Sequence, residues 1–206
     1  NAKKYSLYSE LMYIKRSLFG SERYSFNFNQ RYRFSNRLTI SQGVFLGPQN
    51  NNTGFAGFAS NGDIIFGKRD IKTVENILNI KYSFSDKMNI NTRVRHYWSR
   101  VEYRQFFTLL ENGELGTNTT YTNNRNQNLN FFNIDMVYTW QFAPGSFINI
   151  VWKNSVQDFN QVVSRGYFKN FGQTMEADEN NNLSFKIIYF LDYLQLKKLN
   201  KKKKTS

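Results

Sequence analysis

Residues 128–156 read NLNFFNIDMVYTWQFAPGSFINIVWKNSV, and their pattern is the clearest indication of the fold. Between Phe131 and Phe142, apolar and polar side chains alternate with a period of two, which is typical of a β-strand and not of a helix. The apolar positions are Phe132, Ile134, Met136, Tyr138, Trp140 and Phe142. Pro144 and Gly145 favour a tight turn, because proline presets φ and glycine tolerates the positive φ that follows. The stretch therefore predicts a β-hairpin.

The returning strand repeats the alternation, so the hairpin has one apolar, aromatic face and one polar, partly charged face. Its apolar positions are Ile148, Ile150, Trp152 and Val156. Two environments produce such a pair of strands. In a soluble β-sandwich the apolar face packs on a second sheet. In a transmembrane β-barrel that face meets lipid and the polar face lines the lumen.

The composition excludes several classes of protein. The 206 residues contain no run of about 18 apolar residues, which rules out helical membrane spans. No Cys and a single His exclude disulfide scaffolds, thiolate metal sites and Cys nucleophiles. The 20 Phe, 13 Tyr and only 2 Pro suit many strands with an aromatic surface. The chain begins at Asn1 without an initiator Met, so we interpret it as a mature protein or as part of a longer one.

The same alternation recurs along the chain and predicts about eight strands, which occupy residues 1–196. Three connections are tight, and they follow Phe34, Phe84 and Phe142. The connections between these hairpins are long and lie near 48–71, 103–127 and 157–182. Because antiparallel strands alternate in direction, the tight turns gather at one end of the sheet and the long loops at the other.

This asymmetry favours a transmembrane β-barrel, whose periplasmic turns are short and whose extracellular loops are long. A soluble sandwich has no reason to sort its loops in this way. Tyr24 precedes Phe34, and Phe132 precedes Phe142, by about ten residues. At roughly 3.3 Å per residue and a tilt of about 40°, that distance spans the lipid-facing band of about 25 Å. We therefore predict an all-β, antiparallel transmembrane barrel, followed by a basic periplasmic tail at 197–206.

The alternation also assigns side chains to the two faces of the predicted barrel. The lumen-lining set is Arg23, Arg31, Arg33, Glu75, Lys81, Arg93, Arg95, Asp135, Lys153, Lys186 and Asp192. The lipid-facing and girdle set is Tyr24, Phe34, Phe84, Trp98, Phe132, Tyr138, Trp140, Phe142, Trp152, Phe185, Tyr189 and Tyr193. Cations dominate the first set, which indicates either an anion-favouring pore or ion pairs that fill a narrow barrel. A barrel of eight strands is filled by its own side chains, so a pore requires further strands.

Three runs carry a resemblance to a known family: Arg95–Ser99, Thr139–Ser155 and Phe185–Tyr193. They resemble the C-terminal region of an uncharacterised family of Bacteroidota outer-membrane proteins. That family joins an N-terminal domain similar to family 9 carbohydrate-binding modules to a C-terminal β-barrel. The resemblance implies that this chain is the C-terminal segment of a larger barrel and that glycan is a possible ligand of the whole protein.

No residue pattern points to catalysis. We interpret His96 as a rim residue and not as a catalytic base, and a lone His without any Cys argues against a zinc site. Neither Asp135 with Asp192 nor Glu111 with Glu114 has a spacing that marks a glycosidase pair. The loop aromatics are candidates for contact with a sugar or a partner protein, or for internal packing: Tyr103, Phe106, Phe107 and Tyr121.

The basic tail fits anionic lipid headgroups, or a solvated segment, better than nucleic acid. The expected function is that of an outer-membrane anchor or pore linked to glycan handling, without catalytic residues, metal or cofactor. A structural subunit of an outer-membrane complex is the alternative, and a barrel-borne hydrolase is the less favoured one. The expected partners are outer-membrane lipid, lipopolysaccharide and other outer-membrane proteins, in a Gram-negative cell.

Overall fold

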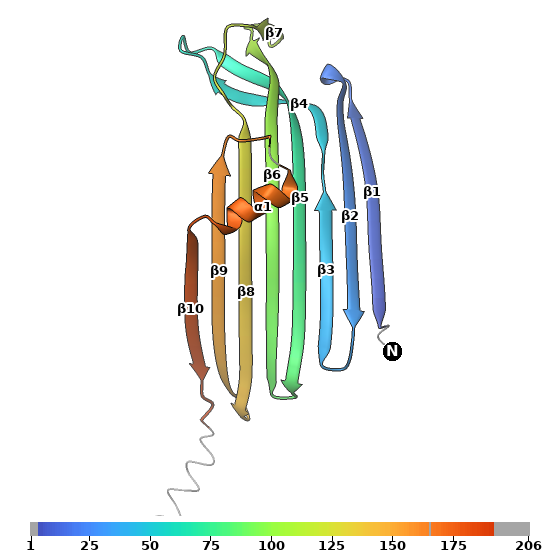
Figure 1. Ribbon diagram of the computed structural model, residues 1–206, viewed down its shortest axis with the longest axis vertical. Coiled ribbons are helices and arrows are strands. Elements are labelled where there is room, and N and C mark those ends of the chain that lie inside the picture. The colour runs from blue at the N-terminus through green and yellow to red at the C-terminus, as the bar shows by residue number, and fades with distance from the viewer. Residues whose placement is uncertain (1–3, 165, 192–206) are drawn as a thin grey trace, which may run out of the picture.

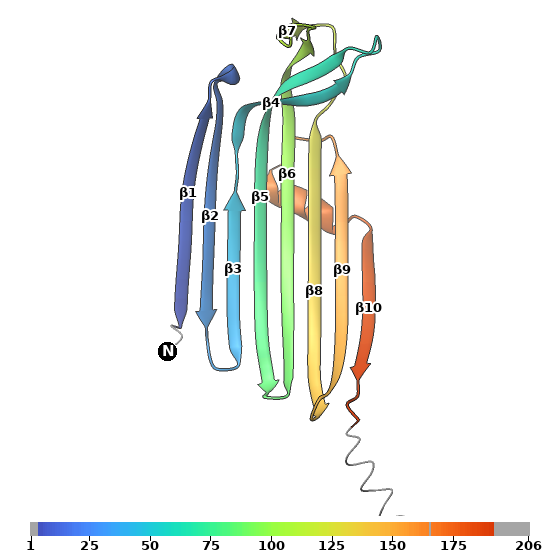
Figure 2. The same cartoon turned by 180° about the vertical axis from the view of Figure 1, so that it is seen from behind.

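The computed structural model describes residues 4–164 and 166–191. Figures 1 and 2 show a single layer of long strands, with one short helix lying across one face. Asp192, Tyr193 and the tail at 197–206, all assigned roles from the sequence, lie outside the described residues. The described part of the chain has no helix long and apolar enough to cross a membrane.

The elements follow one another along the chain as a meander of strands. Their bounds are β1 Tyr5–Arg16, η1 Leu18–Gly20, β2 Ser21–Arg33, β3 Leu38–Leu46, β4 Gln49–Phe58, β5 Ile64–Ser85, β6 Met88–Leu109, β7 Leu115–Asn118, β8 Gln127–Ala143, β9 Ser146–Asn160, α1 Tyr167–Met175 and β10 Glu179–Ile188. Every strand pair is antiparallel. The prediction of an all-β, antiparallel fold is confirmed.

Strands β8 and β9 form the hairpin predicted from residues 128–156. Phe132 lies opposite Val156 and Tyr138 opposite Ile150, so the apolar side chains of both strands share one face. The turn contains Gly145 at φ 71°, a conformation that costs a residue with a Cβ more than it costs glycine. The register is irregular only beside this turn, between Gln141 and Ala143.

Eight strands form the path β1-β2-β3-β5-β6-β8-β9-β10, and β4 and β7 pair beside it. The path is open within the described residues, because β1 and β10 are its two ends and do not pair with each other. The sheet is therefore not a closed barrel. The pattern along each strand determines its two faces, but it does not determine how many strands complete a circle.

The three tight turns lie at one end of the sheet, which we call the turn end, and the long connections lie at the other (Figure 1). The connections near 48–71 and 103–127, expected to be loops, contain β-strands. The first contains β4 and the start of β5, and the second contains the end of β6 and β7. This upper region has a small core of Ala56, Ile65 and Tyr121, against which Tyr103 and Phe106 pack.

Candidate functional site

Pairing brings the predicted lumen-lining residues onto one face, which we call the polar face. One row of partners crosses all eight strands of the path without an apolar side chain. The row is Ser6, Arg31, Ser41, Asn79, Arg93, Asp135, Lys153 and Asn182. By the same alternation, Arg23, Arg33, Glu75, Lys81, Arg95 and Lys186 also lie on this face. The polar face is therefore continuous from one edge of the sheet to the other.

The opposite face, which we call the apolar face, has the complementary composition. Its row above the turns is Tyr5, Tyr32, Ile40, Ile80, Thr92, Met136, Trp152 and Leu183. The predicted lipid-facing residues share this side: Tyr24, Phe34, Phe84, Trp98, Phe132, Tyr138, Trp140, Phe142, Phe185 and Tyr189. In the part of the chain that the structure describes, no second layer of strands covers them, and Phe185 is 66% exposed.

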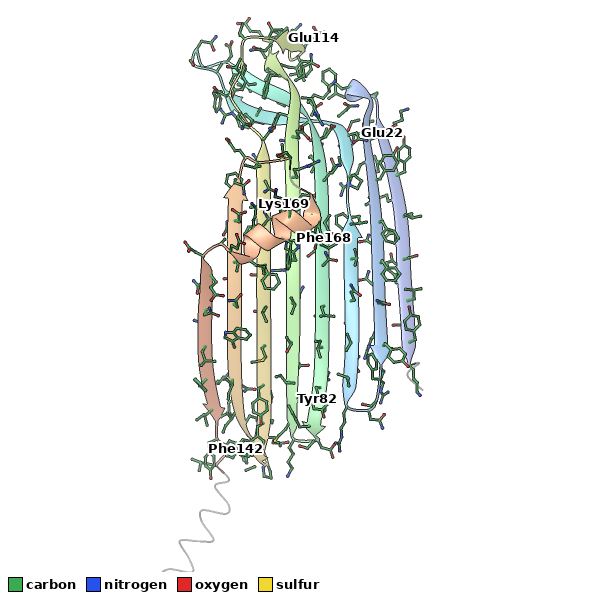
Figure 3. The ribbon with its side chains drawn as sticks, viewed as in Figure 1. Glu22, Tyr82, Glu114, Phe142, Phe168 and Lys169 are labelled. Atoms are coloured by element: carbon green, nitrogen blue, oxygen red, sulfur yellow. The ribbon has the colours of Figure 1, made fainter. Side chains whose placement is uncertain are left out.

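Aromatic side chains of the apolar face gather at the turn end. Phe34 packs edge-on against Tyr32, Phe84 against Tyr82, and Phe142 stacks on Tyr189 with 6.2 Å between ring centroids. Figure 3 places Tyr82 and Phe142 near this end and Glu22 and Glu114 at the far end. The apolar face thus begins with a band of aromatic rings beside the turns.

Charges on the polar face are mostly unpaired within the described residues. The ion pair on this face joins Lys153 Nζ to Asp135 Oδ1 at 3.9 Å, and both side chains are well exposed. Exposed pairs of this kind contribute about 0–1 kcal/mol. Arg33 donates through Nη2 to Asn36 Oδ1 at 2.8 Å. The polar face is therefore net cationic and wet, and not a network of ion pairs.

Three adjoining depressions hollow the polar face near the turn end, and we call them together the basic groove. They enclose about 420, 350 and 370 Å³. Arg31 lines all three, Lys81 lines the first and third, and Arg93 lines the second and third. Arg33 and Arg37 line the first. The register explains this gathering, because Arg31 and Arg93 share the polar row and Lys81 lies opposite Thr39 on β3.

Helix α1 and the polar residues beneath it are not predicted from the sequence. Tyr167 Oη accepts a hydrogen bond from Asn76 Nδ2 at 2.8 Å and lies 2.9 Å from His96 Nδ1. Burial raises the pKa of Tyr167 above its ordinary value of 10.0, and the hydrogen bond from Asn76 opposes this rise. The helix therefore docks on the sheet through a neutral phenol.

Asn170, also on α1, continues this contact. It joins Asn128 and Asn130 of β8 through hydrogen bonds, and all three side chains are at most 1% exposed. Trp98 Nε1 donates to Asn128 Oδ1 at 2.7 Å, so Trp98 lies on the apolar face but is buried under α1 and only 5% exposed. His96 is buried there too, against the rings of Tyr167 and Phe171. The sequence does contain a signal that something covers this part of the apolar face, because Asn128, Asn130 and His96 are polar residues at otherwise apolar positions of β8 and β6.

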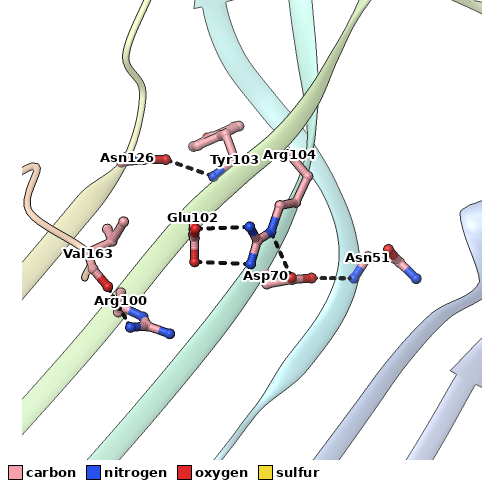
Figure 4. Close-up of polar contacts among 8 residues, drawn as sticks. All are labelled: Asn51, Asp70, Arg100, Glu102, Tyr103, Arg104, Asn126 and Val163. Atoms are coloured by element: carbon pink, nitrogen blue, oxygen red, sulfur yellow. Dashed lines mark hydrogen bonds and ion pairs between the residues drawn. The ribbon is translucent and has the colours of Figure 1, made fainter. Parts of the chain in front are cut away.

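A second group of polar contacts lies where the long strands rise above the sheet (Figure 4). Arg104 pairs with Asp70 at 3.1 Å and with Glu102 at 3.0 Å, and Asp70 also accepts from the Asn51 backbone N–H. Each carboxylate there is already engaged by a cation or a backbone donor. No group of three or more Asp, Glu, His or Cys residues in the described ranges could hold a metal ion. In Figure 4 the bond from Asn51 to Asp70 thus ties β4 to β5, and the pair of Arg104 with Asp70 ties β6 to β5.

The comparison with known proteins gives one positive result. No curated protein matches this chain. Residues 1–200 match the model of a family described as a domain of unknown function, DUF5916. Because that match covers nearly the whole chain, the chain belongs to the DUF5916 family.

Proposed function

We propose that this chain is part of a transmembrane β-barrel in the outer membrane of a Gram-negative bacterium, with its apolar face toward lipid and its polar face toward a water-filled lumen. In this proposal the protein is an outer-membrane anchor or pore. The open edges β1 and β10 pair with further strands of the full-length protein, because a lumen with room for water needs more than eight strands.

The observation that carries the proposal is the exposed apolar face of a one-layer sheet. Soluble monomers rarely expose continuous apolar patches above a few hundred Å². Here exposed apolar side chains extend from Leu11 of β1, 81% exposed, to Ile187 of β10, 69% exposed. Hydrocarbon is the solvent that makes such a surface stable, and the fully polar row on the reverse side suits water.

The height of the apolar face supports the same proposal. It extends from the aromatic band at Phe34, Phe84 and Phe142 up to the row of His96 and Phe132, where α1 covers it. From Met88 to His96 the strand rises about 20 Å at a tilt of about 40°, close to the height of the lipid-facing band of about 25 Å. In this reading α1 lies at the headgroup level and shields the buried Asn residues from hydrocarbon.

A second candidate function is favoured by one observation on α1. Phe168 projects from the helix and is 86% exposed, next to Lys169 (Figure 3). An exposed aromatic side chain at the headgroup level suits contact with a neighbouring outer-membrane protein as well as with lipid. This arrangement supports the accessory-subunit alternative. The resemblance to Bacteroidota proteins with a carbohydrate-binding-like domain supports a link to glycan, which rests on parts outside this chain.

Two measurements on the full-length protein test the proposal. We expect it to sediment with the outer membrane and to migrate differently in detergent gels before and after boiling, as folded barrels do. We also expect stepwise conductance in planar lipid bilayers. Recovery in the soluble fraction would contradict the membrane assignment. Membrane insertion without conductance would favour the anchor and accessory-subunit function over the pore.

A further inference from the structure

We infer that the basic groove binds the phosphate group of a small soluble solute at the turn end of the lumen. This inference rests on the proposed orientation of the polar face. It adds a ligand class and a position to that proposal, since nothing in the general pore function requires a binding site at either end.

The groove gathers cations from four elements of the chain. Arg31 comes from β2, Arg37 from the turn that follows it, Lys81 from β5 and Arg93 from β6. Arg33, also on β2, is the fifth cation of the groove, and its hydrogen bond to Asn36 holds the guanidinium beside the turn. The groove is a product of the tertiary fold, because strand pairing brings Arg31 beside Lys81 and Arg93, which are at least 50 residues away in the sequence.

The cations of the groove lack carboxylate partners within the described residues. None of Arg31, Arg33, Arg37, Lys81 and Arg93 lies within 4.0 Å of a carboxylate oxygen there. Asp135 lines the edge of the groove, but its nearest cation is Lys153. Like charges held together repel one another, and a multivalent anion relieves that repulsion.

The side-chain types suit a phosphate group. A guanidinium offers parallel N–H donors that match two oxygens of one phosphate, and an ammonium adds a compact point charge. Hydroxyl and amide groups between the cations supply further donors: Ser6, Asn36, Thr39, Ser41 and Ser83. Each depression has the size of a small-molecule site, so a phosphorylated metabolite or a diphosphate fits where a polymer does not.

The test is calorimetric titration of the full-length protein, folded in a non-ionic detergent, with inorganic pyrophosphate. The groove variant is Arg31→Gln, because Arg31 lines all three depressions. The matched control is Lys186→Gln, which removes the same charge from the polar face of β10, outside the groove. Loss of one charged hydrogen-bonding group should weaken binding about tenfold or more in the groove variant and less than about twofold in the control.

Each outcome is decisive. Saturable binding that Arg31→Gln weakens and Lys186→Gln preserves supports the site, whether or not the protein conducts. No saturable binding, or equal weakening in both variants, overturns it. Binding of a short-chain phosphatidic acid but not of pyrophosphate also overturns it, because the phosphate would then come from lipid. Conductance without pyrophosphate binding leaves the pore intact and removes the site, so the two proposals fail separately.

Discussion

Tyr167 Oη lies 2.9 Å from Nδ1 of His96, although 71 residues separate the two in sequence. This contact fixes a nine-residue helix on an otherwise uncovered sheet face. Tyr167→Phe keeps the ring and removes the hydrogen bonds to His96 and Asn76. We expect docking of α1 to weaken by about 1 kcal/mol, seen as roughly fivefold faster hydrogen exchange of the α1 amides.

The control for this change is Lys169→Ala, because Lys169 lies on the same helix and its side chain is exposed. Docking should also depend on pH. Burial raises the pKa of Tyr167 above its ordinary value of 10.0 when α1 is docked. The phenol of an undocked helix therefore ionises at a lower pH than that of a docked helix, and docking is lost as the pH rises above 10.0. Unchanged exchange in Tyr167→Phe, and no loss of docking at alkaline pH, would contradict this role of the phenol.

Substitution of a buried Asn under α1 should lower the stability of the protein more than Tyr167→Phe does. Asn170→Ala leaves the side chains of Asn128 and Asn130 without their helix partner in a dry site. We expect the free energy of unfolding to fall by about 1–3 kcal/mol, measured by urea titration. Asn123→Ala is the matched control, since Asn123 is exposed, and should change stability by less than about 0.5 kcal/mol. Equal effects would argue against a buried network.

The turn between β8 and β9 allows a paired test with glycine. Gly145 has φ 71°, and a Cβ there would lie 2.9 Å from Cβ of Phe190. Gly145→Ala should therefore destabilise the hairpin by about 1 kcal/mol or more. Gly172→Ala in α1 meets no atom within 4 Å and should favour the helix by up to about 1 kcal/mol. If both variants changed the free energy of unfolding in urea in the same direction, Gly145 would not need the positive φ of this turn.

A charge should be tolerated on one face of β9 and not on the other. Ile150 lies on the apolar face opposite Tyr138, and Val151 lies on the polar face opposite Val137. In lipid vesicles, Ile150→Arg should lower the free energy of unfolding by about 2–4 kcal/mol, since the side chain would enter hydrocarbon. Val151→Arg should cost much less. A larger cost at Val151 would mean that the faces are reversed.

The sequence was sufficient for the eight strands of the main path and for their faces, because alternation at positions such as Phe132, Ile134 and Met136 is a local property that pairing preserves. It did not predict β4 and β7, which lie in two of the expected loops. It was insufficient for α1. The helix contains Gly172 and Asn170, which are weak helix formers, so tertiary contacts stabilise it. The gathering of Arg31, Lys81 and Arg93 in one groove likewise depends on strand order and register. Barrel closure depends on strand number, which no local pattern encodes.

The orientation of the two faces can be measured directly, because the chain has no Cys and a single introduced thiol is unique. Ile150→Cys and Val151→Cys, each labelled with a small fluorophore, would be compared in vesicles that contain brominated lipid chains. We expect strong quenching by the lipid at position 150, and quenching by aqueous iodide but not by lipid at position 151. Aqueous quenching at both positions, or the reverse pattern, would show that the apolar face does not meet hydrocarbon.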